Sequence, residues 1–205
     1  IQQGQTQVVV LTGEAGIGKT RLVVEFLRWG RAQGADILQG HAFETERGLP
    51  YQPLIECLRS RIDQENAPDD LLSDLWLAEL ARMLPELRDR YPDLPSASMD
   101  ETVARTRLFE AVARLGEALA DRAPVVLSLD DVQWADAASL DMLHYISRRW
   151  AASARPVLLL LNLRTEALIT PNALSRWLSR LQRDLSTLSL TLGPLTVEDL
   201  SLIHI

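Results

Sequence analysis

The sequence has little of several things that would narrow its class at once. It contains a single cysteine, Cys57, which excludes an intrachain disulfide and is typical of the cytoplasm, where thiols stay reduced. Its longest apolar runs, Val8–Leu11 and Val157–Leu161, are far shorter than the roughly 20 residues that cross a bilayer, so we expect no contact with a membrane. Residues 1–7 are polar and lack the basic start of a signal peptide.

Positive charge is also scarce. Lys and Arg number 21 against 28 Asp and Glu, which gives a net charge of −7 and a pI of about 5.0. A domain that grips DNA usually carries a basic surface. We therefore expect any contact with DNA to belong to another domain of a longer protein. A chain that lacks an initiator Met and ends abruptly at Ile205 is expected to be a fragment of such a protein.

What is present is the composition of an ordinary globular domain, with 47% hydrophobic and 24% charged residues in 205. Short apolar runs alternate with helical patterns. The patterns predict strands over 8–12, 36–40, 125–130, 157–162 and 185–192, and helices over 19–33, 50–61, 69–84, 101–120, 137–151 and 171–181. This alternation predicts an α/β fold with a mostly parallel sheet. The long stretch between the second and third strands predicts a helical insertion over about 50–121.

The segment Gly13–Thr20 (GEAGIGKT) matches the phosphate-loop pattern G-x-x-x-x-G-K-T, between a predicted buried strand and a predicted helix. Its glycines let backbone N–H groups turn toward a phosphate, and the helix start favours negative charge. Lys19 would reach the β- and γ-phosphates, and the Thr20 hydroxyl would ligate Mg²⁺. We expect ATP or ADP to be held by Gly13, Glu14, Ala15, Gly16, Ile17, Gly18, Lys19, Thr20 and Arg21. No base-specific motif excludes GTP.

Two adjacent acids end the third predicted strand, VVLSLDD. Hydrolysis at a phosphate loop needs an acid near the metal and a group that orients or deprotonates water. We assign Asp130 to the metal and Asp131 to the water; the alternative is that both acids merely end a strand. Arg164 follows the fourth strand and is expected to sense the γ-phosphate, with a solvated surface arginine as the alternative. Weaker candidates are Asn162 for the same task, His41 and Glu44 beside the phosphates, and Gln133 and Trp134, which are expected to serve structure.

Together, GEAGIGKTRL, VVLSLDDVQWAD, LLLLNLRTEAL and GHAFETERGLPYQPLIECLR resemble the STAND class of AAA+-related ATPases. The similarity is greatest to the nucleotide-binding domains of large ATP-binding regulators of the LuxR family, and it covers nearly the whole chain. The resemblance implies a P-loop three-layer α/β/α fold with strand order 5-1-4-3-2. It also implies that Asp130 is the Mg-coordinating acid, Asp131 the water-activating acid and Arg164 the sensor. A helical lid would begin near residue 195 and be cut short.

The same resemblance implies a function. Such proteins are switches in which ADP favours a closed form, and ATP with an inducer favours an open form that self-associates. We therefore expect an ATP/ADP-binding regulatory domain of a bacterial signalling or LuxR-type transcription protein, with weak or no hydrolysis in isolation. Two alternatives stay open: an active AAA+ ATPase of the replication-initiator or loader type, and a scaffold module that holds ADP without hydrolysing ATP.

Overall fold

The computed structural model describes residues 5–46, 49–65, 68–96 and 101–194. Its centre is a five-stranded sheet in the order β2-β3-β4-β1-β5, in which every neighbouring pair of strands is parallel. The strands are β1 (Gln7–Gly13), β2 (Asp36–His41), β3 (Val125–Asp130), β4 (Val157–Arg164) and β5 (Thr187–Leu192). This is the predicted order 5-1-4-3-2 counted from the other edge. The three-layer α/β fold with its parallel sheet is therefore confirmed.

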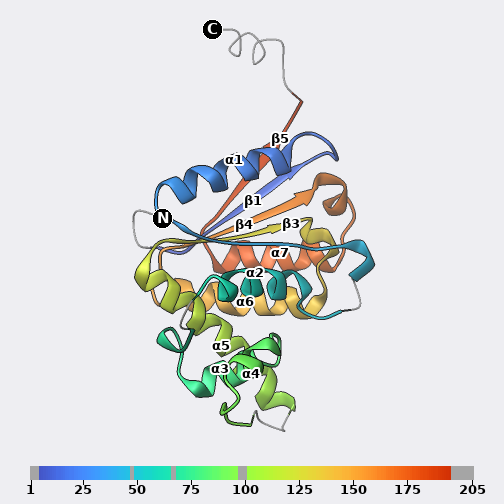
Figure 1. Cartoon of the computed structure of the whole chain (residues 1–205). Coiled ribbons are helices and arrows are strands. Elements are labelled where there is room, and N and C mark those ends of the chain that lie inside the picture. The colour runs from blue at the N-terminus through green and yellow to red at the C-terminus, as the bar shows by residue number, and fades with distance from the viewer. Residues whose placement is uncertain (1–4, 47–48, 66–67, 97–100, 195–205) are drawn as a thin grey trace.

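Helices cover both faces of this sheet (Figure 1). Helix α1 (Lys19–Ala32) lies over one face, where its Val23 and Leu27 pack against Val126 of β3 and Leu158 of β4. The other face packs against α2 (Gln52–Asp63), α6 (Ala137–Ala152) and α7 (Ala173–Asp184). Strands β3 and β4 are buried on both faces, which explains why their sequences are continuous apolar runs without polar alternation.

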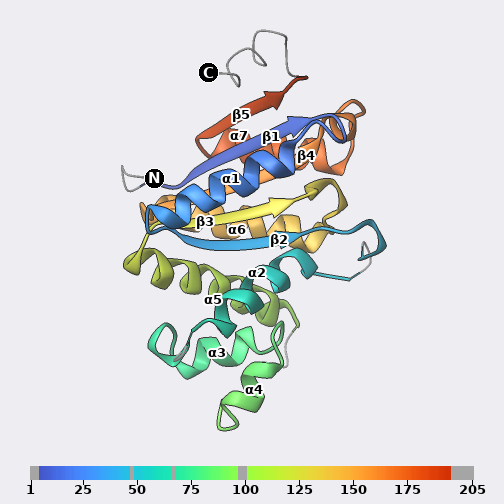
Figure 2. The same ribbon diagram turned by 45° about the horizontal axis from the view of Figure 1, so that its top comes forward.

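The connection between β2 and β3 is helical, as predicted. It contains α2, α3 (Asp74–Leu80), α4 (Glu86–Arg90) and α5 (Glu101–Arg122), together with the 3-10 turns η1 (Glu44–Glu46) and η2 (Pro68–Asp70). Figure 2 shows α3 and α4 beyond α5, on the side away from the sheet. The remaining 3-10 turns, η3 (Val132–Trp134) and η4 (Thr165–Leu168), follow β3 and β4.

One predicted helix was wrong in extent. The pattern predicted a single helix over 69–84, whereas the structure has η2, then α3, and then a separate turn before α4. Ser73 is extended, with ψ of 158°, so α3 begins only after it. After Leu80 two backbone hydrogen bonds span three residues instead of the four of an α-helix, from Arg82 N to Glu79 O and from Met83 N to Leu80 O. Proline at position 85 disfavours a helical conformation in the residue before it, which ends the segment.

Other element ends agree more closely. Asp136 caps α6, because its carboxylate accepts a hydrogen bond from Ser139 N at 2.9 Å. Helix α7 runs to Asp184, three residues beyond its predicted end, so β5 starts at Thr187 rather than at 185. The lid that is expected to begin near residue 195 lies outside the described residues. Because all strands are parallel, the candidate site residues at their carboxyl ends share one edge of the sheet.

Candidate nucleotide-binding site

The phosphate loop lies between the end of β1 and the start of α1. Gly16 and Gly18 have φ angles of +78° and +105°, a region that favours glycine. A Cβ at either position would meet nothing within 4 Å, so backbone conformation rather than space requires glycine there. Gly13 differs, because a Cβ there would lie 2.9 Å from Leu192 O of the neighbouring strand β5. The sequence therefore places glycines where the chain must turn or approach another strand.

The Lys19 side chain folds back over this loop. Its Nζ donates hydrogen bonds to Gly13 O and Glu14 O, each at 2.8 Å, and the residue is only 7% exposed. A buried ammonium needs compensating partners, and here carbonyl oxygens of the loop supply them. The loop thus holds a positive charge at its centre, where an anion with several oxygens would be stabilised.

The side chains of Thr20 and Asp130 are hydrogen-bonded. Thr20 Oγ1 donates to Asp130 Oδ2 at 3.0 Å, which joins the first turn of α1 to the end of β3. The other carboxylate oxygen of Asp130 accepts from Asn162 Nδ2 at 2.5 Å and from Asp131 N at 2.9 Å. A hydroxyl and a carboxylate next to a phosphate site are the oxygen ligands that Mg²⁺ prefers. The two residues therefore fit a magnesium ion shared with a bound nucleotide.

Asn162 is a buried polar residue that holds the Asp130 carboxylate in place. It is 1% exposed in β4, beside β3, and its Oδ1 has no hydrogen-bond partner among the described residues. Its amide nitrogen holds Asp130, so the residue is part of the site, although it was only a weaker candidate for sensing phosphate. A polar residue inside the run LLLLNLR is the signal that could have identified it, because an apolar buried strand tolerates an amide only where it has a partner.

Asp131 sits in an unusual backbone conformation. Its φ of 53° and ψ of 41° are left-handed, a region that non-glycine residues adopt mainly at turns and functional sites. Its Oδ1 accepts from Gln133 Nε2 at 2.7 Å and lies 3.6 Å from Arg164 Nε. Arg164 N in turn donates to Gln133 Oε1 at 3.2 Å. Gln133 thus bridges the ends of β3 and β4, a role that its prediction as a structural residue left unspecified.

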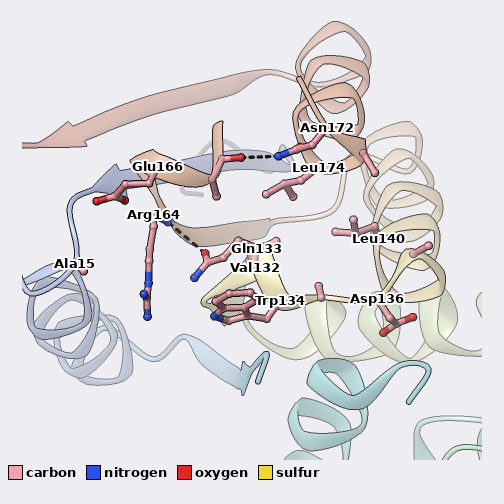
Figure 3. A pocket seen from close by; sticks show the side chains of 14 residues that line it. Ala15, Val132, Gln133, Trp134, Asp136, Leu140, Arg164, Glu166, Asn172 and Leu174 are labelled. Carbon is pink, nitrogen blue, oxygen red and sulfur yellow. Dashed lines mark hydrogen bonds between the residues drawn. The ribbon is translucent and has the colours of Figure 1, made fainter. Parts of the chain in front are cut away.

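The contact between Arg164 and Asp131 is a weak one. The two side chains are 42% and 39% exposed, and a solvent-screened ion pair of this kind contributes little stability. Figure 3 shows Arg164 extending from the end of β4, with Ala15 of the phosphate loop and Gln133 also labelled around the space. A cavity of about 800 Å³ opens here, lined by Ala15, Gln133, Trp134 and Arg164 among others. The Arg164 guanidinium therefore has room to leave Asp131 and pair with another anionic group.

Several predicted residues do not join this cluster. Arg21 is 80% exposed and pairs with Glu25, one turn further along α1. His41 is the register neighbour of Asp130, but its Nδ1 lies 3.1 Å from Glu56 Oε1 of α2. Glu44 is exposed in η1. Among the described residues no group of three or more His, Cys, Asp or Glu side chains is arranged to hold a metal ion. No helix in the same part of the chain is long and apolar enough to cross a membrane.

The chain is similar to several known proteins. An uncharacterized protein of Rhizobium meliloti (strain 1021), R02095, is 29% identical over 186 residues, which cover 85% of this chain and 17% of that protein. A chain of the HORMA:CdnC:Trip13 complex of E. coli MS115-1 is 16% identical, with a TM-score of 0.48 over 96% of this chain and 51% of its own. The Walker-type ATPase PABY2304 of Pyrococcus abyssi is 12% identical, with a TM-score of 0.48 over 94% and 50%.

The chain thus spans less than a fifth of the curated relative and about half of these two solved chains. The family model described as the AAA ATPase domain matches residues 1–160, a stretch that contains the phosphate loop, Asp130, Asp131 and the first half of β4. Over three quarters of the sequence is included in that match. The chain therefore belongs to the AAA ATPase domain family.

Proposed function

We propose that this domain binds Mg-ATP and ADP and serves as the regulatory switch of a larger bacterial signalling or LuxR-type transcription protein. Its hydrolysis of ATP would be weak or absent in isolation, and any contact with DNA would be made by another domain. The observation that carries nucleotide binding is the joined set of Lys19, Thr20 and Asp130 around the phosphate loop. Thr20 donates to Asp130 from an element far apart in the sequence, and Lys19 beside it donates to two carbonyl oxygens of the loop.

Each residue has a distinct task in this proposal. Lys19 exchanges its loop carbonyls for β- and γ-phosphate oxygens, and loop N–H groups donate to the same phosphates. Thr20 and Asp130 hold Mg²⁺, which would neutralise charge on the phosphates when bound. Asn162 keeps the Asp130 carboxylate oriented between the two strands.

Two features support a switch rather than a rapid hydrolase. Asp131, the acid assigned to water, accepts a hydrogen bond from Gln133 and lies beside Arg164, so its charge is already partly engaged. A general base must reach the attacking water, and these contacts compete with that role. Arg164 lies beside Asp131 in an open cavity, and in this proposal a γ-phosphate, which only ATP supplies, is its alternative anionic partner. The ends of β3 and β4 would therefore differ between the ATP and ADP states.

Calorimetric titration of the purified chain with ATP and ADP, with and without Mg²⁺, tests the proposal. Acid extraction first establishes whether nucleotide is already bound. We expect wild-type protein to bind both nucleotides and Lys19→Ala to lose at least about tenfold in affinity, because charge-assisted contacts to phosphate are lost. Unchanged affinity in Lys19→Ala would overturn the phosphate-loop assignment.

The rate of ATP hydrolysis distinguishes the proposed switch from the two alternative functions. An active AAA+ ATPase would release phosphate continuously under saturating ATP, whereas a switch would convert its bound ATP slowly over hours. A pure ADP scaffold would bind ADP and leave ATP intact over the same time. Sustained turnover of about 1 s⁻¹ or more, in the usual range of enzymes, would contradict the switch proposal.

A further inference from the structure

A second cavity lies away from the phosphate loop, between the start of α2, the turn after α3, α5 and α6. Its volume is about 740 Å³, within the range of about 300–1,000 Å³ that holds small molecules. Its walls include Tyr51, Met83, Arg105, Phe109 and Tyr145. They come from four segments that are far apart in the sequence, so the folded domain rather than a local motif creates the cavity.

Three aromatic rings form a continuous wall of this cavity. Tyr51 meets Phe109 edge-on, with ring centroids 6.2 Å apart and planes at 88°. Phe109 in turn lies 5.7 Å from Tyr145, with a tilt of 59° between the planes. Met83, 5% exposed, lies within the same wall. Aromatic rings and a thioether favour another flat ring, since edge-to-face and sulfur–aromatic contacts both stabilise one.

Arg105 supplies a positive charge beside these rings. Its guanidinium carbon lies 5.1 Å from the Phe109 ring centroid, and its Nη2 donates to Asp141 Oδ2 at 2.7 Å. The side chain is 51% exposed, and a guanidinium has five N–H donors, more than its contacts with Asp141 and Tyr51 use. A carboxylate on a bound ring would therefore find charge-assisted donors next to an aromatic surface.

Tyr51 connects this cavity to the segment that carries the acids. Its backbone is left-handed, with φ of 66°, and it precedes the first residue of α2. Its N–H donates to Asp136 Oδ2 at 3.1 Å. The other oxygen of Asp136 caps α6 through Ser139 N, and Asp136 follows Asp131 by one turn of 3-10 helix. A ligand that displaces the Tyr51 ring would act on the hydrogen bond that positions this turn.

We propose that this cavity binds a small aromatic carboxylate and that its occupancy is coupled to the nucleotide site through Tyr51 and Asp136. Binding of the carboxylate stands on the geometry alone, whereas the coupling rests on the proposed nucleotide function. The aromatic wall recognises the ring, and Arg105 recognises the charge. The Tyr51–Asp136 hydrogen bond carries the effect of the ligand toward the ends of β3 and β4.

Binding is tested on the nucleotide-free chain with three indole probes that differ in charge: indole-3-acetate, the neutral indole-3-acetamide and the cationic tryptamine. Calorimetry gives affinities, and amide NMR shifts show which residues respond. We expect indole-3-acetate to bind at least about tenfold more tightly than the other two, and Arg105→Gln to abolish that advantage. Arg180→Gln, an exposed arginine of α7, is the matched control and should change nothing. Equal binding of the three probes, or equal effects of the two substitutions, would overturn the site.

Coupling is tested by titrating ADP in the presence and absence of saturating indole-3-acetate. Linkage requires each ligand to change the affinity of the other by the same factor, and we expect at least about fivefold. Asp136→Asn keeps an oxygen to cap α6 but can replace the acceptor of Tyr51 N–H by an amide donor, so both ligands should still bind while the factor falls toward one. A factor of one in wild-type protein would overturn the coupling. Failure of ADP to bind at all would instead refute the nucleotide proposal and leave the probe titration intact.

Discussion

Lys19 is the single lysine of the chain, and its Nζ is buried against loop carbonyls. An amine-acylating reagent should therefore modify it slowly. Mg-ATP should slow the reaction further, because phosphate oxygens would accept hydrogen bonds from the ammonium group and shield it from the reagent. Peptide mass spectrometry after timed acylation measures the rate at this one site, with the chain's terminal amine as an internal control. If Mg-ATP leaves the Lys19 rate unchanged while calorimetry shows ATP binding, Lys19 does not contact the nucleotide.

Asp131 offers a substitution that should spare the fold. Asparagine tolerates the left-handed conformation about as well as aspartate, so Asp131→Asn should keep the turn after β3. We expect ATP binding to persist and the slow conversion of ATP to ADP to fall by at least about tenfold, because general-base catalysis contributes at least that much. Single-turnover phosphate release measures it. An unchanged rate would remove Asp131 from the chemistry.

Arg164 should distinguish the two nucleotides. If its guanidinium leaves Asp131 for a γ-phosphate, Arg164→Gln should weaken ATP binding by about three- to tenfold and leave ADP binding within about twofold, as expected for one charge-assisted contact. Calorimetry on both nucleotides gives the ratio. Equal losses for ATP and ADP would mean that Arg164 acts on the fold and not on the γ-phosphate.

The residues of the site divide into those that sequence can identify and those that it cannot. Gly13–Thr20 and the adjacent acids belong to patterns whose chemistry dictates their order, so their meeting at one edge of the sheet was predictable. The bond from Asn162 to Asp130 and the Gln133 bridge depend on side-chain direction between neighbouring strands. The hydrogen bond from Tyr51 to Asp136 joins residues that are 85 positions apart, and no local sequence pattern predicts it.

At the scale of elements, substitution of two helical glycines by alanine should change stability in opposite directions. Gly30 lies near the end of α1, where an added Cβ would be 3.6 Å from Ile37 Cδ1, an ordinary contact. Gly116 lies within α5, where an added Cβ would be 2.3 Å from Trp150, a ring that is 3% exposed and hydrogen-bonded to Ala113 O. Alanine favours a helix by about 0.5–1 kcal/mol over glycine, but overpacking a core costs about 1–3 kcal/mol.

We therefore expect Gly30→Ala to raise the free energy of unfolding slightly and Gly116→Ala to lower it. Urea titrations of the two variants, followed by circular dichroism, measure both changes under identical conditions. Because the substitutions are chemically identical, the comparison isolates helix-to-helix packing of α5 on α6. Destabilisation by both variants to the same degree would show that the Trp150 contact does not decide the outcome.

Element ends were harder to predict than elements. The central strands were predictable because Val125–Asp130 and Val157–Arg164 are buried on both faces and therefore carry unbroken apolar runs. The helix predicted over 69–84 failed because apolar spacing alone does not show where Ser73 is extended or where bonds tighten after Leu80. Leu77 and Leu80 of α3 are buried in the core, and tertiary packing of this kind can override a local helical pattern.

For the whole molecule, Cys57 reports unfolding. It is fully buried, and burial raises the pKa of its thiol, with the charge of Glu56 raising it further. Since the thiolate is the reactive form, alkylation should require the chain to open. When refolding outruns alkylation, Mg-ATP at about 100 times its Kd should slow labelling in mild urea about 100-fold, equivalent to about 2.7 kcal/mol of added stability. At the same ATP concentration Lys19→Ala should be protected at least about tenfold less, and equal protection in that variant would contradict the proposed site.

Because the strands are parallel, the loops at the two ends of the sheet differ in how well they would tolerate an insertion. The connections at one end, near residues 33–35, 123–124 and 153–156, lead into β2, β3 and β4 and lie remote from the phosphate loop. The opposite end holds the loop, both acids and Arg164 within a few turns. A fluorophore, an epitope tag or a circularly permuted terminus belongs at the first end, where it can follow the state of the domain without competing for the space that nucleotide would need.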